Sequence, residues 1–496
     1  MRPSYYWAKW DQLKVQPDVG SLESLAHRIA STFVDRCFYS DEYNPGYIRL
    51  LCHMATFFKD SDLNQIASNA IFGLVIERLC DDFEELQTET YNRLICQIVD
   101  FLRTLPEGME LDQELDSFNL STEDQLYQRI ESIRLSPDER IPASINPRKV
   151  IVLSRVTVGA DVAITSVICQ RVAERFPNAS IHVMGSGKVR QIFTSKSGVK
   201  VHELHYERRG GLVQRFLVWI NLLQQVRQEI DGLDENQFLL LDPDSRLTQL
   251  GVLPLVSAFN YRFFNSRGKA GYPVKASISE LTNLWLDNIL GHGDYCFPRV
   301  WPETPSMNLA LGLRTRTDPH QSCHFITLNF GVGGNSRKRV EDNFETGLVL
   351  KLLQDQTTRV FLDLGFGSDE HRRSQQIIDA ARSEGFSVQE IAFKELESAN
   401  ADTRLFGVHC SVAEISALIA ISDEFIGYDS ACQHIAAAQG IRTYTVFAGT
   451  NNARFIRRWR ACGPGLSEIL YVDTVSRDRP IDQVELVERL MDLRNS

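Results

Sequence analysis

The chain has 496 residues, which is too long for one hydrophobic core, so two or three domains are expected. Its apolar content of 43% is ordinary for a globular protein, and its net charge of −11 argues against a protein devoted to DNA, RNA or an anionic membrane. The ten cysteines are scattered without a Cys-x-x-Cys pair, which favours reduced thiols over a disulfide frame or a zinc site. The sequence has no apolar run long enough for a transmembrane helix and no apolar core of a signal peptide near its start, so a cytoplasmic protein is expected.

The first part of the chain shows helical periodicity and little else. One helix is expected to open near Ser21, with Ser21 or Ser24 as its cap, and another near Asp62. A third is expected from Thr88 to Leu102. A polar linker with prolines at 137, 142 and 147 follows, so we expect an all-α N-terminal domain over residues 1–146.

From residue 148 short apolar strands alternate with helices, a pattern that predicts parallel sheets covered by helices. Proline-containing loops near residues 301–320 interrupt the series, so we expect an α/β protein with two doubly wound domains in tandem, over 147–310 and 311–496. A helix is expected over Val162–Phe176. The expected strands are Lys149–Leu153, Ser180–Met184, Gln237–Leu241, Phe325–Asn329, Val360–Leu364, Glu424–Ile426 and Thr443–Phe447.

The stretch from Phe425 to Gly440 reads as a buried strand, a polar turn and a helix. Asp429 and Ser430 lie where the helix begins, and unpaired N–H groups with partial positive charge at that point suit a phosphate or sugar oxygen. His434 follows Ser430 by four residues and therefore lies on the same helix face, and Gly440 is expected to end the helix. For Asp429 a simple helix N-cap is the alternative, and for His434 a packed histidine bonded to the backbone.

Each of the two expected sheets has a further polar loop directly after its first strand. Residues 329–339 contain three glycines, which let the backbone approach a ligand, and then Lys338 between two arginines, whose cationic groups suit phosphate. The spacing is neither a Walker loop nor Gly-x-Gly-x-x-Gly, so a plain connecting turn stays an alternative. Residues 154–161 end at Asp161, for which a helix cap is one interpretation.

Taken together, the loops at 154–161, 329–339, 366–370 and 427–434 resemble glycosyltransferase family 9, the ADP-heptose:lipopolysaccharide heptosyltransferases, over about residues 148–490. The resemblance implies a GT-B fold, with two Rossmann-like domains facing a cleft. Residues 147–310 would form the acceptor-side domain and residues 311–496 the nucleotide-sugar donor-binding domain, whose C-terminal helix is expected to pack back on the first. Gly159–Val162 is similar to the Gly-Asp-Val turn of the family with one extra alanine, and its Asp161 would be the catalytic base.

The resemblance also implies a donor site. It combines the glycine-rich loop, a lysine for the phosphates, an acid for the nucleoside and a turn of the form Asp-Ser/Thr-Gly-x-x-His, in which alanine here replaces glycine. The acid for the nucleoside is Asp369, which could instead cap the helix that follows it. The implied donor-binding residues are Gly333, Gly334, Lys338, Asp369, Asp429, Ser430, Ala431, Cys432 and His434.

The function implied is an inverting glycosyltransferase that moves a sugar, such as a heptose, from a nucleoside-diphosphate sugar to a hydroxyl of a glycan or protein acceptor. Asp161 would take the hydroxyl proton, and Lys338, Arg337 or Arg339 would stabilise the leaving diphosphate together with the helix start at 429–431. No Asp-x-Asp metal motif stands out, so neither a metal nor a cofactor is expected. Acceptor contacts are expected from Asp244 or Arg246, in the polar loop that follows a strand.

Residues 1–146 have no counterpart in the heptosyltransferases. We interpret them as an element that recruits a protein partner or forms a homo-oligomer. Two other functions stay open: a catalytically inactive nucleotide-sugar-binding or scaffold protein that works through the helical domain, and a sugar-nucleotide epimerase of the same fold. The replacement of the turn glycine by Ala431 and the insertion of Ala160 favour the first of these alternatives.

Overall fold

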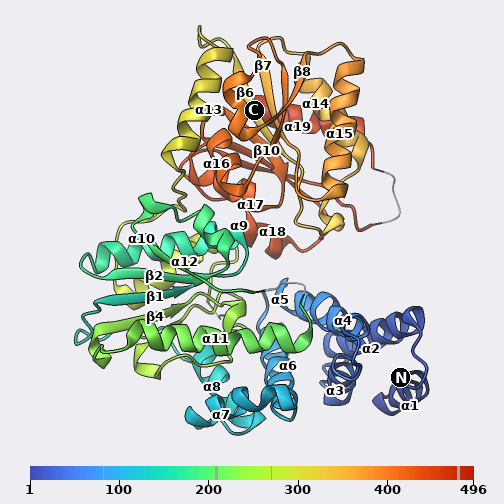
Figure 1. The fold of residues 1–496 in the computed structure, drawn as a ribbon, viewed down its shortest axis with the longest axis vertical. Helices are drawn as coiled ribbons and strands as arrows, with labels where there is room; N and C mark the ends of the chain where they lie inside the picture. Colours follow the sequence, from blue (N-terminus) through green and yellow to red (C-terminus); the bar gives the residue numbers. More distant parts are fainter. Residues whose placement is uncertain (82, 207–209, 268, 270, 477–480) are drawn as a thin grey trace.

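The computed structural model describes all residues except 82, 207–209, 268, 270 and 477–480. A helical N-terminal part is followed by two parallel β-sheets with helices around them (Figure 1). The α/β fold class with a preceding all-α region is therefore confirmed. The helices of the N-terminal part are α1 (Pro3–Leu13), α2 (Val19–Ser40), α3 (Pro45–Met54), α4 (Ser61–Asn69), the π-helical η1 (Ala70–Ile76), α5 (Glu77–Asp81), α6 (Glu85–Arg103), α7 (Met109–Ser117) and α8 (Glu123–Leu135).

The start of α2 differs from the prediction. Asp18 is its N-cap residue, and the carboxylate accepts a hydrogen bond from the backbone N–H of Ser21 at 2.8 Å. Neither Ser21 nor Ser24 caps the helix, because α2 already begins at Val19. Asp is as good a cap as Ser, and only the chain path decides which of several polar residues occupies the position.

The first sheet has five parallel strands in the order β3-β2-β1-β4-β5. Along β1 the side chains alternate, so Ile151 and Leu153 lie in one hydrophobic core while Val150 and Val152 lie in another. Chain connections leave β1 towards β2 on one side and reach β4 on the other, which makes the carboxyl ends of β1 and β4 a topological switch point. The strands are β1 (Lys149–Leu153), β2 (Ser180–Gly185), β3 (Lys200–Glu203), β4 (Phe238–Asp242) and β5 (Tyr261–Phe263).

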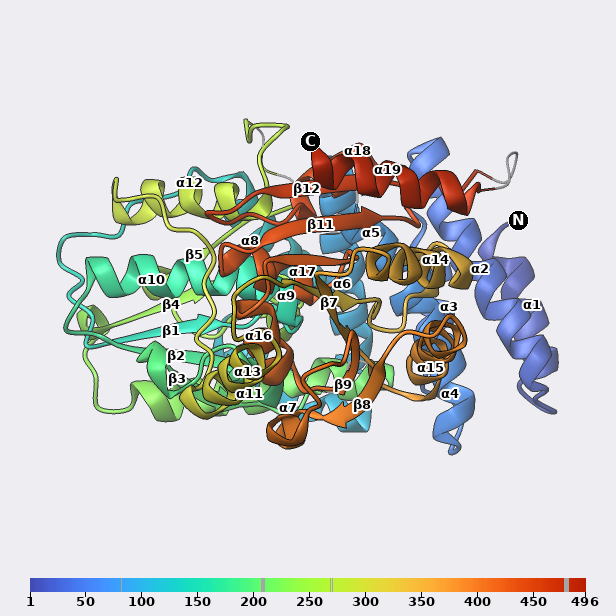
Figure 2. The ribbon, with the colours of Figure 1, turned by 90° about the horizontal axis from the view of Figure 1, so that it is seen from above.

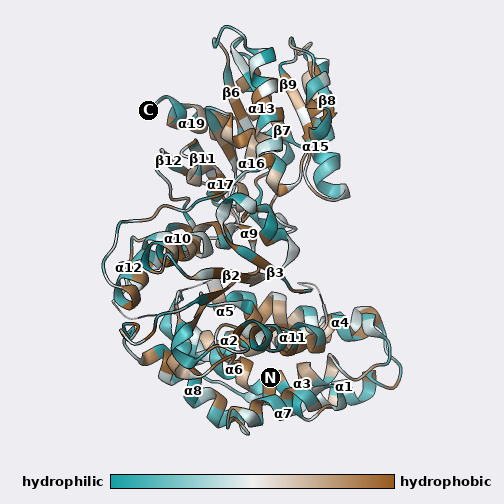
Figure 3. Cartoon of the chain, turned by 60° about the vertical axis from the view of Figure 1, so that its left-hand side comes forward, coloured by the Kyte–Doolittle hydropathy of each residue, from teal (hydrophilic) through white to brown (hydrophobic). Residues whose placement is uncertain are grey.

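The second sheet has seven parallel strands in the order β12-β11-β10-β6-β7-β9-β8. Its switch point lies between β6 and β10, which pair directly. The strands are coloured mostly as hydrophobic in Figure 3, as expected for sheets buried on both faces. They are β6 (His324–Asn329), β7 (Thr358–Asp363), β8 (Val388–Ala392), β9 (Leu405–His409), β10 (Glu424–Tyr428), β11 (Arg442–Phe447) and β12 (Ser467–Tyr471).

Helices connect the strands of both sheets. Those of the first half are α9 (Val158–Ala160), the π-helical η3 (Asp161–Thr165), α10 (Ser166–Arg175), α11 (Leu212–Ile230) and α12 (Ile278–Leu290). Those of the second half are α13 (Thr304–Thr317), α14 (Asp342–Leu353), α15 (Ser368–Ser383), α16 (Val412–Ala420), α17 (Ala431–Ala438), α18 (Ala453–Trp459) and α19 (Gln483–Asn495). In the described part of the chain, we find no helix with the length and apolar character needed to cross a bilayer.

The expected strands are present with ends shifted by at most two residues, and Gly440 follows α17 with a φ of +75°. The helix expected over Val162–Phe176 begins earlier, at Val158, and passes through the π-helical turn η3. The sequence did not reveal β3, β5, β8, β9 and β12, which lie towards or at the sheet edges and are short or partly polar.

The C-terminal helix does not pack back on the first half, contrary to the expectation. α19 contacts α14 and β12 of its own half, beside which it lies in Figure 2. Leu486, Val487 and Leu490 are buried there in the same core as Phe344 of α14, which explains the direction of packing. α18 does reach the first half, because its Arg458 donates to the backbone carbonyls of Pro273 and Ala276.

The helical N-terminal part is not a separate body. Its apolar side chains form one continuous core with α11 and one face of the first sheet, so Ile29 and Ile98 belong to the same cluster as Ile151 and Phe216. The contact between Phe72 of η1 and Phe216 of α11, with ring centroids 6.4 Å apart, lies in this interface. These helices therefore serve as a further layer on the first sheet.

Candidate functional site

The carboxyl ends of β6 and β10 bring the glycine-rich loop and the Asp429 turn together. Ser430 Oγ lies 3.4 Å from Asn329 Oδ1, and Asn329 Nδ2 donates to Asp363 Oδ2 at 2.6 Å. Asn329 and Asp363 end β6 and β7, and Ser430 follows β10, so the three residues lie at the carboxyl ends of three neighbouring strands. Open α/β sheets bind ligands at such a switch point, because the loops after the two adjacent strands run in opposite directions and leave a crevice between them.

Lys338 and Asp429 form an ion pair at this point, with 2.5 Å between Lys338 Nζ and Asp429 Oδ2. The other carboxylate oxygen of Asp429 accepts a hydrogen bond from Gln433 Nε2 at 2.8 Å. The N-cap alternative for Asp429 is wrong, because the N-cap residue of α17 is Ser430. The Ser430 side chain itself forms no capping bond within the described chain, so the first N–H groups of α17 are not satisfied by it.

His434 lies one turn further along α17 and is 3% exposed. Its ring packs edge-on against Trp459 of α18, with ring centroids 6.1 Å apart. Burial lowers the pKa of His434 to about 4, so the imidazole is neutral at pH 7. Cys432, on the same helix, is also buried, and burial raises the pKa of its thiol.

The two halves of the protein meet at their signature turns. α9 and η3 of the first half pack against α17 of the second half. A Cβ atom placed on Gly159 would lie 3.1 Å from His434 Cδ2 and 3.2 Å from Ala431 Cα. Gly159 thus allows a close approach that a larger residue would disturb. The sequence resemblance suggested these turns separately, and the tertiary structure brings them into contact.

Asp161, the expected base, is 1% exposed. Its carboxylate accepts hydrogen bonds from Ser154 Oγ at 2.7 Å, from the Arg155 backbone N–H at 2.8 Å and from Thr165 Oγ1 at 2.8 Å. The capping interpretation needs correction, because Thr157 is the N-cap residue of α9 and the backbone N–H bound by Asp161 precedes the helix. Burial raises the pKa of Asp161 to about 6, although the three hydrogen bonds oppose the shift.

The glycine-rich loop is exposed at Gly333 and Gly334, whose φ angles are +62° and +85°. Only glycine adopts such angles easily, so the loop depends on both residues. Of the two neighbouring acids Asp369 and Glu370, Glu370 is the one bonded to this loop. It accepts hydrogen bonds from the backbone N–H of Val332 at 3.3 Å and from that of Phe366 at 2.8 Å. Asp369, named from the sequence, is exposed in the first turn of α15.

Glu370 is therefore a residue that the sequence reasoning missed. Asp369 and Glu370 are adjacent in the loop at 366–370, and the sequence offered no reason to prefer one of them. Neighbouring residues of a helix point about 100° apart, so a register difference of one position decides which carboxylate faces the loop.

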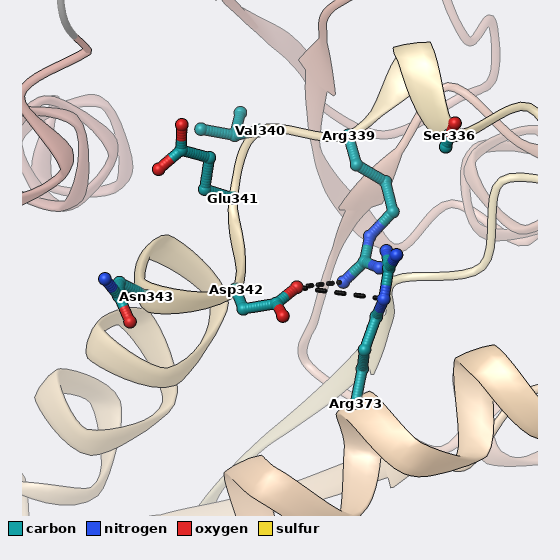
Figure 4. Close-up of a pocket in the computed structure, with 7 residues that line it drawn as sticks. All are labelled: Ser336, Arg339, Val340, Glu341, Asp342, Asn343 and Arg373. Carbon is teal, nitrogen blue, oxygen red and sulfur yellow. Dashed lines mark ion pairs between the residues drawn. The ribbon is translucent and has the colours of Figure 1, made fainter.

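An open hollow of about 460 Å³ lies beside the glycine-rich loop and is lined by Ser336, Arg339, Val340, Glu341, Asp342, Asn343 and Arg373. Figure 4 shows Arg339 and Arg373 converging on the Asp342 carboxylate, at 3.6 and 3.8 Å. Arg339 is buried and is also paired with Glu345, which accepts a hydrogen bond from the Tyr428 hydroxyl at 2.9 Å. Arg339 is thus part of the protein framework, whereas Lys338 pairs with Asp429.

The expected acceptor residue Asp244 is completely buried. Its carboxylate binds Arg267 Nε at 3.0 Å, Arg155 Nη1 at 3.3 Å and Ser266 Oγ at 2.6 Å. Arg246 is partly exposed at the same strand end. The structure therefore places Arg246, and not Asp244, where a ligand could reach it.

Asp242 and Asp244 do have Asp-x-Asp spacing, which the sequence reading passed over. Asp242 binds the Ser245 backbone N–H, the Thr248 hydroxyl and the Tyr261 hydroxyl, at 2.7, 2.6 and 2.8 Å. Burial raises its pKa to about 6. Each carboxylate is thus enclosed in its own hydrogen-bond network, a structural arrangement different from that of two acids open to a shared ion.

Among the described residues, His182, His202 and Glu229 form a group of three side chains with metal-ligand chemistry. His182 Nδ1 lies 2.8 Å from His202 Nε2, and the ring planes differ by only 13° with centroids 4.9 Å apart. The two rings are nearly parallel, and the short distance between their nitrogens is that of an N–H···N hydrogen bond. Lys149 Nζ also binds the Glu229 carboxylate, at 2.7 Å. The side chains of this group therefore have hydrogen-bond or ion-pair partners within the protein.

A comparison with known proteins gives the decisive observation. Residues 383–463 match the model of glycosyltransferase family 9 (heptosyltransferase), and this range includes the Asp429–His434 turn. The chain carries a glycosyltransferase family 9 segment. The resemblance expected from the sequence is thereby confirmed over these residues, and the enzyme class that the match supports is that of a glycosyltransferase. No curated protein sequence matches the chain significantly.

Comparison with solved structures gives matches to glycosyltransferases. A glycosyl transferase family 9 protein from Veillonella parvula DSM 2008 matches with a TM-score of 0.50 and 12% identity, over 73% of this chain and 100% of its own. The E. coli ADP-heptose lps heptosyltransferase II matches with a TM-score of 0.45 and 14% identity, over 70% and 100% of the two chains. E. coli heptosyltransferase WaaC with ADP matches with a TM-score of 0.43 and 13% identity, over 70% and 98%. The GT-B architecture expected for residues after the helical part is confirmed by the first of these.

Proposed function

We propose that this glycosyltransferase is inverting and moves a sugar of the heptose class from a nucleoside-diphosphate sugar to a hydroxyl group of a glycan or protein. One observation carries the proposal. The Lys338–Asp429 pair lies at the switch point of the second sheet, and the turn that bears Gly159 and Asp161 packs directly against the helix that follows Asp429. The candidate donor-binding pair and the candidate base Asp161 thus lie on opposite sides of the contact between the two halves.

On the donor side, the diphosphate binds at the start of α17. The Lys338 ammonium neutralises phosphate charge, and the N–H groups that Ser430 does not cap donate to phosphate oxygens. Asp429 accepts hydrogen bonds from sugar or ribose hydroxyls and holds the Lys338 side chain in place. Gly333 and Gly334 let the backbone pass close to the nucleotide, and Glu370 fixes that loop.

On the acceptor side, Asp161 takes the proton of the attacking hydroxyl. The hydroxyl oxygen forms a bond to the anomeric carbon, the bond from that carbon to the diphosphate oxygen breaks, and the nucleoside diphosphate leaves with the electron pair. A pKa of about 6 makes Asp161 a stronger base than an ordinary carboxylate, yet ionised at pH 7. The acceptor hydroxyl replaces one of the hydroxyls, Ser154 or Thr165, that bind Asp161 in the absence of substrate.

The leaving group needs no metal ion in this proposal, because Lys338 and the helix start supply the positive charge. The donor is then a substrate, and no cofactor takes part. Transfer activity should be the same in EDTA as in buffer with Mg²⁺. A strict requirement for added metal would refute this part of the proposal and leave the donor site itself intact.

The proposal also assigns roles along the chain. Residues 147–310 bind the acceptor, partly through Arg246, and residues 311–496 bind the donor. Residues 1–146 bind a protein partner or a second copy of the chain. The reaction takes place in the cytoplasm, where nucleotide sugars are made.

A second candidate function is that of a nucleotide-sugar-binding protein without turnover. The burial of Asp161 at 1% exposure, with three hydrogen bonds to its carboxylate, favours it. A carboxylate so enclosed also serves to hold the 154–165 turn together, whatever the chemistry.

One experiment separates these functions. The purified protein is screened by thermal shift with ADP, GDP, UDP and dTDP, and with the corresponding nucleotide sugars. Donor hydrolysis is then followed with the sugar of the nucleotide that stabilises most. Stabilisation with hydrolysis supports the transferase, and stabilisation without hydrolysis or transfer supports the binding protein. A protein that responds to none of these nucleotides has neither function.

A further inference from the structure

The short helix α18 belongs to the second half of the protein, which carries the candidate donor site. It contacts both the first half and the helical N-terminal part. Figure 1 places it between α17 of the donor half and α5 of the helical part. Its Arg458 donates to the carbonyls of Pro273 at 2.8 Å and Ala276 at 2.5 Å, in the first half. Its Arg454 donates to the Phe83 carbonyl at 2.9 Å and pairs with Glu84 at 3.2 Å, in the helical part. α18 is thus fixed from both sides.

Phe83 is the residue of the helical part that packs on α18. It lies between α5 and α6, is 7% exposed, and has its ring centroid 6.4 Å from that of Phe455 and 6.3 Å from that of Trp459. Its φ angle is +54°, a backbone conformation that bulky L-residues adopt at a cost and that surrounding contacts must maintain. Phe455 and Trp459 are four residues apart and therefore present one helix face to the Phe83 ring.

The same two aromatic residues contact the donor site. Lys338 Nζ lies 5.5 Å from the centroid of the Phe455 ring, a cation–π arrangement. The Trp459 ring packs against His434, and the Trp459 carbonyl accepts from Gln433 Nε2 at 3.3 Å. Gln433 Nε2 also donates to Asp429. A chain of contacts therefore runs from Phe83 through α18 to both members of the Lys338–Asp429 pair.

We propose that Phe83 is a positioning residue for the diphosphate end of the donor site, and that the helical N-terminal part acts on donor binding through it. The inference rests on the proposed function, since it presumes that Lys338 and Asp429 bind the donor. Without the Phe83 ring, Phe455 and Trp459 lose the surface on which they rest. Lys338 then samples more orientations, and the diphosphate binds more weakly.

The test compares two full-length variants, Phe83→Ala and Phe72→Ala. Phe72 is also a buried phenylalanine of the helical part, but it faces Phe216 and Arg215 of α11 in the first half. Affinity is measured by titration calorimetry with whichever of ADP, GDP, UDP and dTDP gives the largest thermal shift of the unchanged protein. We expect Phe83→Ala to raise Kd about tenfold and Phe72→Ala to change it by less than about twofold.

Kinetics give a readout that lost stability would not produce. Phe83→Ala should raise the KM for the nucleotide sugar about tenfold while kcat at saturating donor stays within about threefold. If Phe83→Ala does not fold, Phe83→Leu replaces it, with a smaller expected shift in Kd. The fluorescence assigned to Trp459, obtained by difference against Trp459→Phe, should change in the Phe83 variant and not in the Phe72 variant.

Three results would count against the inference. Equal nucleotide affinity in Phe83→Ala and the unchanged protein would overturn it and leave the proposed function standing. Equal weakening by Phe83→Ala and Phe72→Ala would assign the effect to general destabilisation and overturn it as well. An unchanged protein that binds none of the four nucleotides would overturn the proposed function and, with it, this inference.

Discussion

The Lys338 ammonium and the Asp429 carboxylate meet at 2.5 Å although they lie 91 positions apart in the chain. The pair joins the glycine-rich loop after β6 to the turn after β10, the two strands that flank the switch point. Asp429 restrains a long, flexible cation, and this lowers the entropy that Lys338 loses when a phosphate binds.

Replacement of Lys338 by Met should therefore weaken nucleoside diphosphate binding. A charged hydrogen bond contributes about 1.5–3 kcal/mol, so Kd should rise roughly 10- to 100-fold in calorimetry. Lys351→Met is the matched control, because Lys351 is exposed near the end of α14 in the same half. Equal affinity in both variants would remove Lys338 from the donor site.

Replacement of Asp161 by Asn should abolish transfer but keep nucleotide binding. Loss of a general base typically lowers the rate about 10²- to 10⁴-fold, and Asn has nearly the same shape. In the unchanged enzyme the base must be ionised, so kcat should fall about tenfold for each pH unit below the pKa of about 6. A variant that retains full transfer activity would show that another group takes the proton.

Three buried aspartates should each make the free energy of unfolding smaller as pH rises from 4 to 7, whereas the lowered pKa of His434 acts in the opposite direction. Burial raises the pKa of Asp161, Asp242 and Asp363 to about 6, above the value of 3.8 for an exposed Asp. The folded state thus binds their protons more tightly, so the stability gained is fully present below about pH 4 and is lost as pH passes 6. Each group contributes at most about 3 kcal/mol.

Asp242→Asn tests this with urea unfolding between pH 4.5 and 7.5. The variant should show a flatter dependence of the free energy of unfolding on pH, because one titrating group is gone. Asp369→Asn, at an exposed carboxyl, serves as the control and should keep the slope of the unchanged protein. An unaltered slope in Asp242→Asn would mean that Asp242 titrates alike in the folded and unfolded states.

The two neighbouring acids at the start of α15 should differ in their effect on nucleotide binding. Glu370→Ala removes the acceptor for the backbone N–H groups of Val332 and Phe366 and so loosens the glycine-rich loop. We expect Kd to rise about tenfold, against less than about twofold for Asp369→Ala. The reverse ranking would support direct binding of the nucleoside by Asp369, as the sequence suggested.

The contact between the two halves can be tested at Gly159. A methyl group there would lie 3.2 Å from Ala431 Cα, so α9 and α17 must move apart by a few tenths of an ångström. Gly159→Ala should lower the transfer rate about tenfold by misplacing the acceptor turn against the donor, with a small effect on nucleotide affinity. The control is Gly73→Ala in η1, where an added methyl group meets no described atom within 4 Å. If Gly159→Ala transfers sugar as fast as Gly73→Ala, the close approach has no functional role.

The sequence predicted the strands of the two sheet centres because each is a run of apolar residues ended by a polar loop, as in Val150–Leu153 and Phe425–Ile426. Edge strands such as β3 and β8 carry charged residues on their exposed positions, so periodicity did not reveal them. The sequence also failed to identify the cap of α2, which is Asp18 and not Ser21. Local patterns identify helices and strands well, but they choose poorly among adjacent polar residues at the ends.

By itself, the sequence determined the fold class, the family resemblance and the loops that carry the candidate site, because hydrophobic periodicity and short motifs are local properties. Only the tertiary structure decided which side chains of those loops meet. It paired Lys338 with Asp429, turned Glu370 instead of Asp369 towards the glycine-rich loop, and enclosed Asp161 and Asp244 in hydrogen-bond networks. It also placed Phe83 of the helical part against α18. Apart from the network of Asp161, which is local in the chain, these relations depend on contacts between residues tens to hundreds of positions apart. Such contacts exist only once the sheets and their helices have packed together.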